Sequence, residues 1–337
     1  MRAARFAGGG AVVIEERADP CPGTGEVVLE VAHCAFCGSD KRLLATGASV
    51  VPGHEIVGRV VAVGEGGDGP ALGQLAAVYA PLFCGSCPWC RCGESQRCSA
   101  MAGVIGWQVD GGFADKVRVP FRNLLPVPPD VPPRRAVLVL DTLGTAAHGL
   151  DRAAEVMGRP HGEPDGRVLV LGCGPLGLGV VGVARHRGQK VYAYDRLPER
   201  LELAVSLGAV PWDAEPAGSE EGEDRFGLVV EAAGDSGARA TASRVVGQGG
   251  AVLMLGEGAE PWSLPPSLHW RRTEAAWVRS FYFPIADAER NWGLLREAGG
   301  ALEELVLCAE PFSELPRVSK AFLAGEVTKP VVDVAGA

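Results

Sequence analysis

The chain has 337 residues, of which 47% are hydrophobic and 22% are charged, and its formal net charge is -9. This length exceeds that of a usual single hydrophobic core, so we expect about two domains. No apolar run approaches the roughly 18 to 20 residues that cross a bilayer. The acidic balance disfavours nucleic acid and anionic membranes as partners, because both attract basic proteins.

The amino-terminal segment and the ten cysteines indicate the compartment. The segment MRAARFAGGGAVVIEERADP has a basic start but no apolar stretch long enough for a secretory signal before Glu15 and Glu16. We therefore expect a cytoplasmic protein whose thiols stay reduced. Clustered thiols in that compartment favour metal binding or catalysis over disulfides.

Residues 1 to about 137 predict a β-rich domain. Short apolar runs, such as EVVLEVA at 26–32 and EIVGRVVAVG at 55–64, are separated by Gly and Pro clusters, which is typical of strands joined by turns. The last sixteen residues, FLAGEVTKPVVDVAGA, finish in another strand-like run. We expect that run to return to the first domain.

Within this domain, residues 84–98 (CGSCPWCRCGESQRC) contain five of the ten cysteines. Four follow the spacing C-x2-C-x2-C-x7-C, which lets one loop surround an ion: Cys84, Cys87, Cys90 and Cys98. Zinc prefers such a tetrahedral set, and four protein ligands leave no open position, so the predicted site is structural. An iron–sulfur cluster, a disulfide pair and a redox switch are the alternatives. Cys92 lies off the pattern and is interpreted as a bystander.

From about residue 166 the pattern changes to buried strands that alternate with helices. Strands are predicted at 167–172, 190–195, 226–234 and 249–256, and helices at 175–188, 198–209 and 237–246. Such alternation predicts βαβ units and a doubly wound parallel sheet. The fold class is therefore α/β, with a β-rich domain beside a Rossmann domain.

A dinucleotide-binding motif, GCGPLG, follows the first of these strands and opens the first helix. Its cofactor-binding candidates are Gly172, Gly174, Pro175, Leu176 and Gly177, where glycines allow a tight turn and close approach of a pyrophosphate. Asp195 ends the next strand, where a carboxylate binds the adenosine ribose and favours NAD over NADP. Arg196 and Arg200 weaken this preference, since guanidinium groups accommodate a 2′-phosphate.

A second set of metal-ligand candidates is spread along the chain. Cys37 lies in CAFCGSD, and His54 and Glu55 lie in PGHEIVG. A thiolate, an imidazole and a carboxylate suit a zinc ion that keeps a position open for chemistry. Taken singly, a cysteine is more often a small buried side chain and a histidine a hydrogen-bonded one.

Five motifs occur in one order: CGSD, PGHEIVGRVVAVG, the four-cysteine lobe, DGGFADKVRVP and LGCGPLGLG. In this order they resemble the zinc-containing alcohol dehydrogenases of the medium-chain dehydrogenase/reductase superfamily, over nearly the whole chain. The resemblance implies a GroES-like catalytic domain of residues 1–138 and 283–337, with a Rossmann NAD-binding domain of residues 139–282 inserted. It also implies a homodimer or homotetramer. Two zinc ions are expected, one structural and one catalytic, the latter bound by Cys37 and His54 with Glu55 as an alternate or outer ligand.

The pattern is closest to the sorbitol, threonine and glucose dehydrogenase branches, which have a glutamate near the metal. The matching stretch here, LVLDTLGTAAHG, offers Asp141. A carboxylate inside an apolar run is costly to bury unless a metal or hydrogen-bond donor compensates it. Direct ligation, ligation through water and capping of the following helix are all open for Asp141.

These parts together predict hydride transfer between a secondary alcohol and NAD, with the alcohol bound to zinc as an alkoxide. Ser39 stands where the family places a hydroxyl that accepts the alcohol proton; it is also a candidate helix N-cap. Arg42 stands where the family often has histidine, so the proton relay ends elsewhere. Lys41 and Arg42 favour a polar or anionic substrate, such as a polyol or cyclitol.

Three aromatic residues are pocket candidates by the same resemblance: Trp107, Tyr282 and Phe283. Core packing explains aromatic residues at such positions equally well.

Two other functions are considered. A zinc-independent quinone or enoyl reductase would need neither metal site, and a non-catalytic redox regulator that binds NAD and zinc would not need Cys37, Ser39 and His54 together.

Overall fold

The structure is a computed structural model that describes residues 1–66, 69–158, 166–213, 225–258, 260–264, 268–300 and 302–335. The chain divides into two units. The first comprises Met1–Asp141, Pro284–Trp292 and Glu303–Ala337, and the second comprises Thr142–Phe283 and Gly293–Leu302. The segment Gly293–Leu302 thus belongs to the second unit, whereas the sequence placed residues 283–337 together in the first domain.

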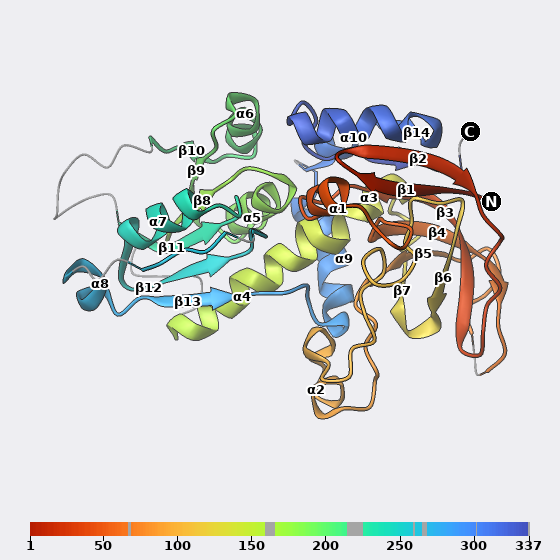
Figure 1. The fold of residues 1–337 in the computed structure, drawn as a ribbon. Coiled ribbons are helices and arrows are strands. Elements are labelled where there is room, and N and C mark those ends of the chain that lie inside the picture. Colours follow the sequence, from red (N-terminus) through yellow and green to blue (C-terminus); the bar gives the residue numbers. More distant parts are fainter. Residues whose placement is uncertain are drawn as a thin grey trace. The chain divides into compact units, whose positions relative to one another are not determined.

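The first unit is built on a sheet with the strand order β14-β15-β3-β4-β5-β7, to which β6 adds by pairing with β3. Figure 1 shows these strands together with a separate hairpin of β1 and β2. The strands are β1 (Arg2–Gly8), β2 (Ala11–Glu16), β3 (Glu26–Ala35), β4 (Glu55–Val63), β5 (Leu75–Val78), β6 (Lys116–Pro120), β7 (Leu124–Pro126), β14 (Ala309–Pro311) and β15 (Val331–Asp333).

Strand β3 is the central strand of this sheet. It pairs antiparallel with β4 on one side and with both β6 and β15 on the other. Most of its residues are buried, as expected for the apolar run EVVLEVAHCA. The carboxy-terminal segment of the chain therefore completes the sheet that the amino-terminal segment begins.

Short helices connect and flank these strands: α1 (Asp40–Thr46), α2 (Pro88–Arg91), α3 (Pro133–Ala136) and α10 (Leu315–Ala324). Helix α9 (Ala288–Ala298) contains residues of both units. A buried aromatic cluster lies in the core of the first unit and consists of Phe6, Phe36, Phe113 and Phe322. Phe36 is its centre, with ring centroids 4.5 Å from Phe113 and 5.2 Å from Phe322 on α10.

The second unit is a parallel sheet with the order β10-β9-β8-β11-β12-β13. Its strands are β8 (Arg167–Leu171), β9 (Lys190–Tyr194), β10 (Val210–Pro211), β11 (Phe226–Glu231), β12 (Val246–Met254) and β13 (Ala276–Arg279). Counted in chain order, this is the 3-2-1-4-5-6 arrangement of dinucleotide-binding folds. The chain reverses direction across the sheet between β8 and β11, and ligands of such sheets bind at that reversal.

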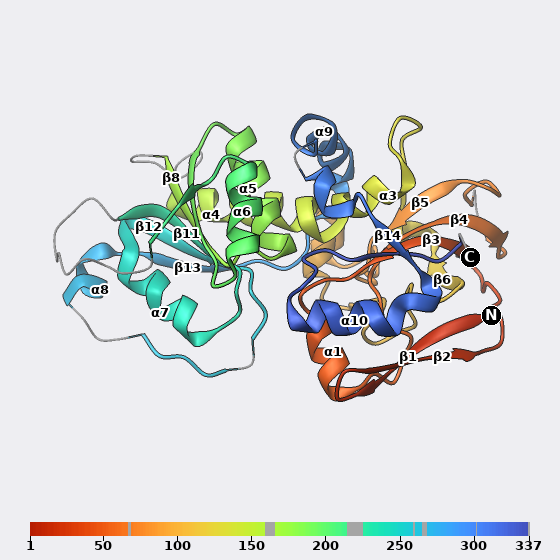
Figure 2. The ribbon, with the colours of Figure 1, turned by 90° about the horizontal axis from the view of Figure 1, so that it is seen from above.

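The helices of this unit are α4 (Ala146–Met157), α5 (Pro175–His186), α6 (Pro198–Ser206), α7 (Ser236–Val245) and α8 (Leu268–Thr273). Helix α5 packs on β8 and β9, and α7 packs on β11 and β12. Figure 2 shows α5 and α7 on opposite sides of these strands, which makes the sheet doubly wound as predicted. No helix in the described part of the chain combines the length and apolar character needed to cross a bilayer.

Replacing Phe322 by alanine tests whether the carboxy-terminal segment contributes to the core. The ring is 1% exposed and packs on Phe36, so Phe322→Ala is expected to lower the free energy of unfolding by about 3 to 5 kcal/mol. The measurement is urea unfolding followed by circular dichroism. Phe281→Ala is the control, since Phe281 is 46% exposed; an equal loss in both variants would contradict the assignment.

Candidate metal centres and dinucleotide site

Strand register brings the Cys37 and His54 motifs together. In the β3–β4 ladder Ala35 pairs with Glu55 and Cys34 with Ile56. Cys37 follows the end of β3 and His54 precedes the start of β4, so both lie just beyond the same end of the ladder. Residues far apart in sequence therefore meet without any local motif that joins them.

Asp141 joins this group from a π-helical turn, η4 (Leu140–Thr145). Its Oδ2 atom lies 3.3 Å from Nε2 of His54 and 3.4 Å from Sγ of Cys37. One potential ligand atom from each of Cys37, His54, Glu55 and Asp141 lies within 4.8 Å of all the others. The structure thus places the four predicted ligands in one cluster, which we call the Cys37 cluster.

Asp40 supports the cluster, a role that sequence reasoning missed. This fully buried carboxylate accepts a hydrogen bond of 2.8 Å from the backbone N–H of Cys37 through Oδ2. Its Oδ1 atom lies 3.4 Å from Nδ1 of His54. Carboxylates in this position orient metal-ligating histidines through the second ring nitrogen. The available signal was the position of Asp40, three residues after Cys37 in CGSD.

Lys329 is a second residue that the sequence analysis did not single out. Its side chain is fully buried, and its Nζ forms an ion pair with Oε2 of Glu55. Burial raises the pKa of Glu55 to about 7, although Lys329 opposes this shift. The only signal was a lysine next to the apolar run PVVDV, in a segment expected to form a strand.

The cluster fits a bound metal ion by its chemistry and by one uncompensated atom. Its donors are a thiol, an imidazole and carboxylates, which suit zinc. Oε1 of Glu55 is buried and accepts no hydrogen bond from the described residues, and a cation in the cluster would offset the cost of burying it whether or not this oxygen coordinates the ion. Burial also raises the pKa of Cys37, and a nearby cation would offset that effect.

The other residues predicted near the cluster lie as follows. Ser39 is half-buried before α1, and among the described residues its side chain caps none of the helix N–H groups. The Arg42 guanidinium lies over the Trp107 ring at 4.6 Å, and that ring is 6.3 Å from the His54 ring between centroids. Cys34 is buried within β3 and Phe283 is buried in the second unit.

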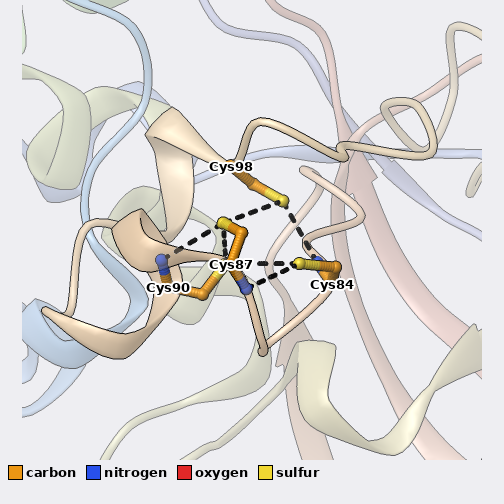
Figure 3. Close-up of side chains that lie close together, drawn as sticks. All are labelled: Cys84, Cys87, Cys90 and Cys98. Atoms are coloured by element: carbon orange, nitrogen blue, oxygen red, sulfur yellow. Dashed lines mark hydrogen bonds between the residues drawn. The ribbon is translucent and has the colours of Figure 1, made fainter.

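The second predicted metal site is the four-cysteine lobe, whose side chains gather together in Figure 3. Sγ of Cys87 lies 3.5 Å from that of Cys90 and 3.9 Å from that of Cys98, and Sγ of Cys84 lies 4.0 Å from that of Cys90. Four sulfurs bound at about 2.3 Å to one tetrahedral zinc lie about 3.8 Å apart. The observed spacing therefore matches a zinc site, and none of the ten cysteines, all of them described, forms a disulfide.

Hydrogen bonds within the lobe lower the pKa of two of its four thiols, whereas burial raises that of Cys90. The Cys90 N–H points to Sγ of Cys87, and this hydrogen bond lowers the pKa of Cys87 to about 5. Bonds from Ser86 lower the pKa of Cys84 to about 7. Since the thiolate is the form that binds metal, these contacts favour binding. Cys92 instead donates to the carbonyl of Trp89 and lies outside the cluster of four.

The predicted dinucleotide loop follows β8 and leads into α5. Gly172 has φ +98°, and a Cβ on Gly177 would lie 1.9 Å from the carbonyl oxygen of Gly172, so both positions require glycine. Gly174 is the N-cap of α5, and a Cβ added there meets no atom within 4 Å. The space beside Gly174 is therefore open, and the first N–H groups of a helix are the kind of donors that bind a pyrophosphate. Pro175 and Leu176 form the first turn of this helix.

Asp195 is fixed beside this loop. Its Oδ2 accepts a hydrogen bond of 2.7 Å from the Cys173 N–H and its Oδ1 accepts one of 2.9 Å from the Leu197 N–H. The carboxylate is thus held at the end of β9, next to the dinucleotide loop. Arg196 is exposed and Arg200 is half-buried, with a buried Nε that makes no hydrogen bond to the described residues.

A pair of cysteine variants tests the lobe. Cys87→Ser is expected to lose one equivalent of zinc, because serine is a poor zinc ligand. Cys92→Ser is expected to keep the full zinc content. Elemental analysis after dialysis against a weak chelator measures both. Equal zinc in the two variants would show that Cys87 is not a ligand.

Comparisons with known proteins identify relatives of the chain. Residues 23–129 match the family model described as the alcohol dehydrogenase GroES-like domain. The chain is 31% identical over 289 residues to zinc-type alcohol dehydrogenase B of Aspergillus flavus, a match that covers 82% of this chain and 65% of that protein. It is also 30% identical over 259 residues to L-galactonate-5-dehydrogenase of Escherichia coli, covering 73% of each.

Among solved structures, alcohol dehydrogenase TADH from Thermus sp. ATN1 is similar with a TM-score of 0.87 and 32% identity. The match covers 99% of this chain and 100% of that one. The predicted resemblance and the α/β fold class are confirmed by these matches. The chain belongs to the zinc-containing alcohol dehydrogenase family of the medium-chain dehydrogenase/reductase superfamily.

Proposed function

We propose that the protein is a zinc-dependent dehydrogenase that transfers a hydride between a polar secondary alcohol and NAD. The observation that carries this proposal is the Cys37 cluster, in which four potential ligand atoms from three separate segments lie within 4.8 Å of one another. A quinone or enoyl reductase without zinc has no use for such a cluster. A non-catalytic regulator needs only the cysteine lobe and the dinucleotide loop.

The proposed roles at the cluster follow from its contacts. Cys37, His54 and Asp141 hold the metal. A zinc ion bound there would act as a Lewis acid that lowers the pKa of an alcohol hydroxyl. Asp40 fixes the orientation of the His54 ring through Nδ1, as the 3.4 Å approach supports. Ser39, two residues after Cys37, accepts the proton that the alcohol releases and passes it toward solvent.

The second unit binds the cofactor in this proposal. The N–H groups at the start of α5 hold the pyrophosphate, and the carboxylate of Asp195 accepts hydrogen bonds from the adenosine ribose. NAD accepts the hydride when it is bound. NAD is favoured over NADP because a 2′-phosphate would meet the negative charge of Asp195.

The substrate is proposed to be a polyol, a cyclitol or a related polar alcohol. Lys41 and Arg42 are positively charged and lie in the same turn of α1 as Asp40, the carboxylate that supports the Cys37 cluster. The guanidinium of Arg42 lies over Trp107, whose ring neighbours that of His54. The similarity to L-galactonate-5-dehydrogenase agrees with a polyhydroxylated substrate. Incubating the protein and NAD with polyols, cyclitols, amino alcohols and hydroxy acids, and following NADH, identifies the compound.

Cys37→Ala tests the proposed catalytic site. The variant is expected to lose turnover and one of two zinc equivalents, because the cluster loses its only thiolate ligand. Zinc analysis and NADH formation are measured on the same preparation, and Cys34→Ala, with a buried thiol outside the cluster, is the matched control. Full activity in Cys37→Ala refutes the assignment.

In the unmodified chain, two zinc ions support a dehydrogenase, one supports a regulator and none supports a reductase.

Asp195→Ser tests the cofactor preference. Removing the carboxylate deletes the proposed hydrogen-bond acceptor for the ribose and the negative charge that opposes a 2′-phosphate. The ratio of kcat/KM for NAD to kcat/KM for NADP should therefore fall by about tenfold or more. Steady-state kinetics with each cofactor measures this ratio. Asp213→Ser in the same unit provides the control, and an unchanged ratio in Asp195→Ser would exclude a ribose contact.

A further inference from the structure

Lys329 is buried next to the Cys37 cluster without a role in the proposed function. Its side chain is 0% exposed and that of Glu55 is 1% exposed, and the two form an ion pair. A lysine is almost never fully buried unless it is paired. The free-energy cost of burying and ordering this ammonium group is therefore offset by its pairing with the carboxylate of Glu55.

The backbone fixes Lys329 in this place. Val331 pairs with Ala35 at the start of β15, and the Phe36 N–H donates a hydrogen bond of 3.0 Å to the carbonyl oxygen of Pro330. Lys329 precedes these two anchored residues, so its main chain lies beside the segment that leads to Cys37. Glu55 approaches from the opposite neighbour of β3, at the start of β4.

The two oxygens of Glu55 have different surroundings. Oε2 is paired with Lys329, whereas Oε1 is buried without a hydrogen-bond partner in the described residues. A ligand oxygen of Glu55 lies within 4.8 Å of the ligand atoms of the other three cluster residues. Glu55 is therefore close enough to become a fourth protein ligand, and a zinc site with four protein ligands has no position left for a substrate.

We propose that Lys329 is a positioning residue that holds Glu55 outside the metal's set of ligands and so keeps one coordination position open. This inference rests on the proposed function, in which Cys37, His54 and Asp141 bind the metal. Without the ammonium group, the Glu55 carboxylate would be buried with no opposite charge except the metal. A buried carboxylate in that state gains most by coordinating the cation.

Cobalt substitution tests this proposal without relying on activity. Co²⁺ replaces zinc in the full chain, and the visible absorption of Cys37→Ala is subtracted so that only the Cys37 cluster contributes. The remaining bands report the number and type of ligands. Imidazole, neutral at pH 8, serves as a probe that binds to cobalt only where a position is open. The test variants are Lys329→Met, Glu55→Gln and the double variant. Lys320→Met is the control, because it makes the same substitution at an exposed lysine on α10.

Lys329→Met is expected to show altered cobalt bands and an imidazole dissociation constant raised about tenfold or more. Lys329→Met/Glu55→Gln should restore the wild-type bands and imidazole affinity, because the competing carboxylate is gone. Lys320→Met should match the wild type. A merely structural role of Lys329 would not be reversed by a second substitution at Glu55.

Two results would overturn the inference. One is a Lys329→Met variant with wild-type bands and imidazole affinity. The other is a Lys329→Met/Glu55→Gln variant whose cobalt bands differ from those of the wild type, which would show that Glu55 is already a ligand. This second result can be obtained even if Lys329→Met does not fold, because the double variant has no buried charge at either position. Failure of the proposed function would give a different result from failure of this inference. If the Cys37 cluster binds no metal, the wild-type chain would bind no more cobalt than Cys37→Ala.

Discussion

Strand β3 lies between β4 and β15, and the register of these two ladders determines which side chains meet at its carboxyl end. Ala35 pairs with Glu55 on one side and with Val331 on the other. A shift of the β3–β4 ladder by one residue would turn Glu55 to the other face of the sheet, and a shift of the β3–β15 ladder would do the same to Val331. The positions of Cys37, His54, Glu55 and Lys329 depend on these backbone hydrogen bonds, whereas Asp141 reaches the cluster from η4.

Charge balance is the second constraint on the site. Cys37, Glu55, Asp141 and Asp40 bring negative charge, or potential negative charge, into a buried region, and Lys329 brings one positive charge. Burial of like charges is costly unless cations compensate them. Lys329 supplies one compensating charge, and the proposed divalent ion would supply the rest. The lobe solves the same problem differently, with backbone N–H groups directed at its sulfurs.

The sequence predicted the parts of this protein whose signals are local. The alternation of apolar runs after residue 166, the glycine spacing from Gly172 to Gly177 and the cysteine spacing of the lobe are each contained in short segments. Asp40 and Lys329 were not recognised, because a carboxylate at a helix start and a lysine near a strand have many ordinary explanations. Their importance depends on burial and on partners, which only the tertiary structure provides. The inclusion of Gly293–Leu302 in the second unit likewise had no local signal.

The two clusters differ in how much of the chain each must have before it can form. Cys84 and Cys98 are 14 positions apart, whereas Glu55 and Lys329 are 274 apart. As the ribosome releases the chain from its amino terminus, the lobe has all its thiols early and can capture an ion while most of the protein is still untranslated. The other centre gains its lysine only when nearly all of these residues have emerged. The lobe can thus have all four thiols in place long before Glu55 gains its buried partner.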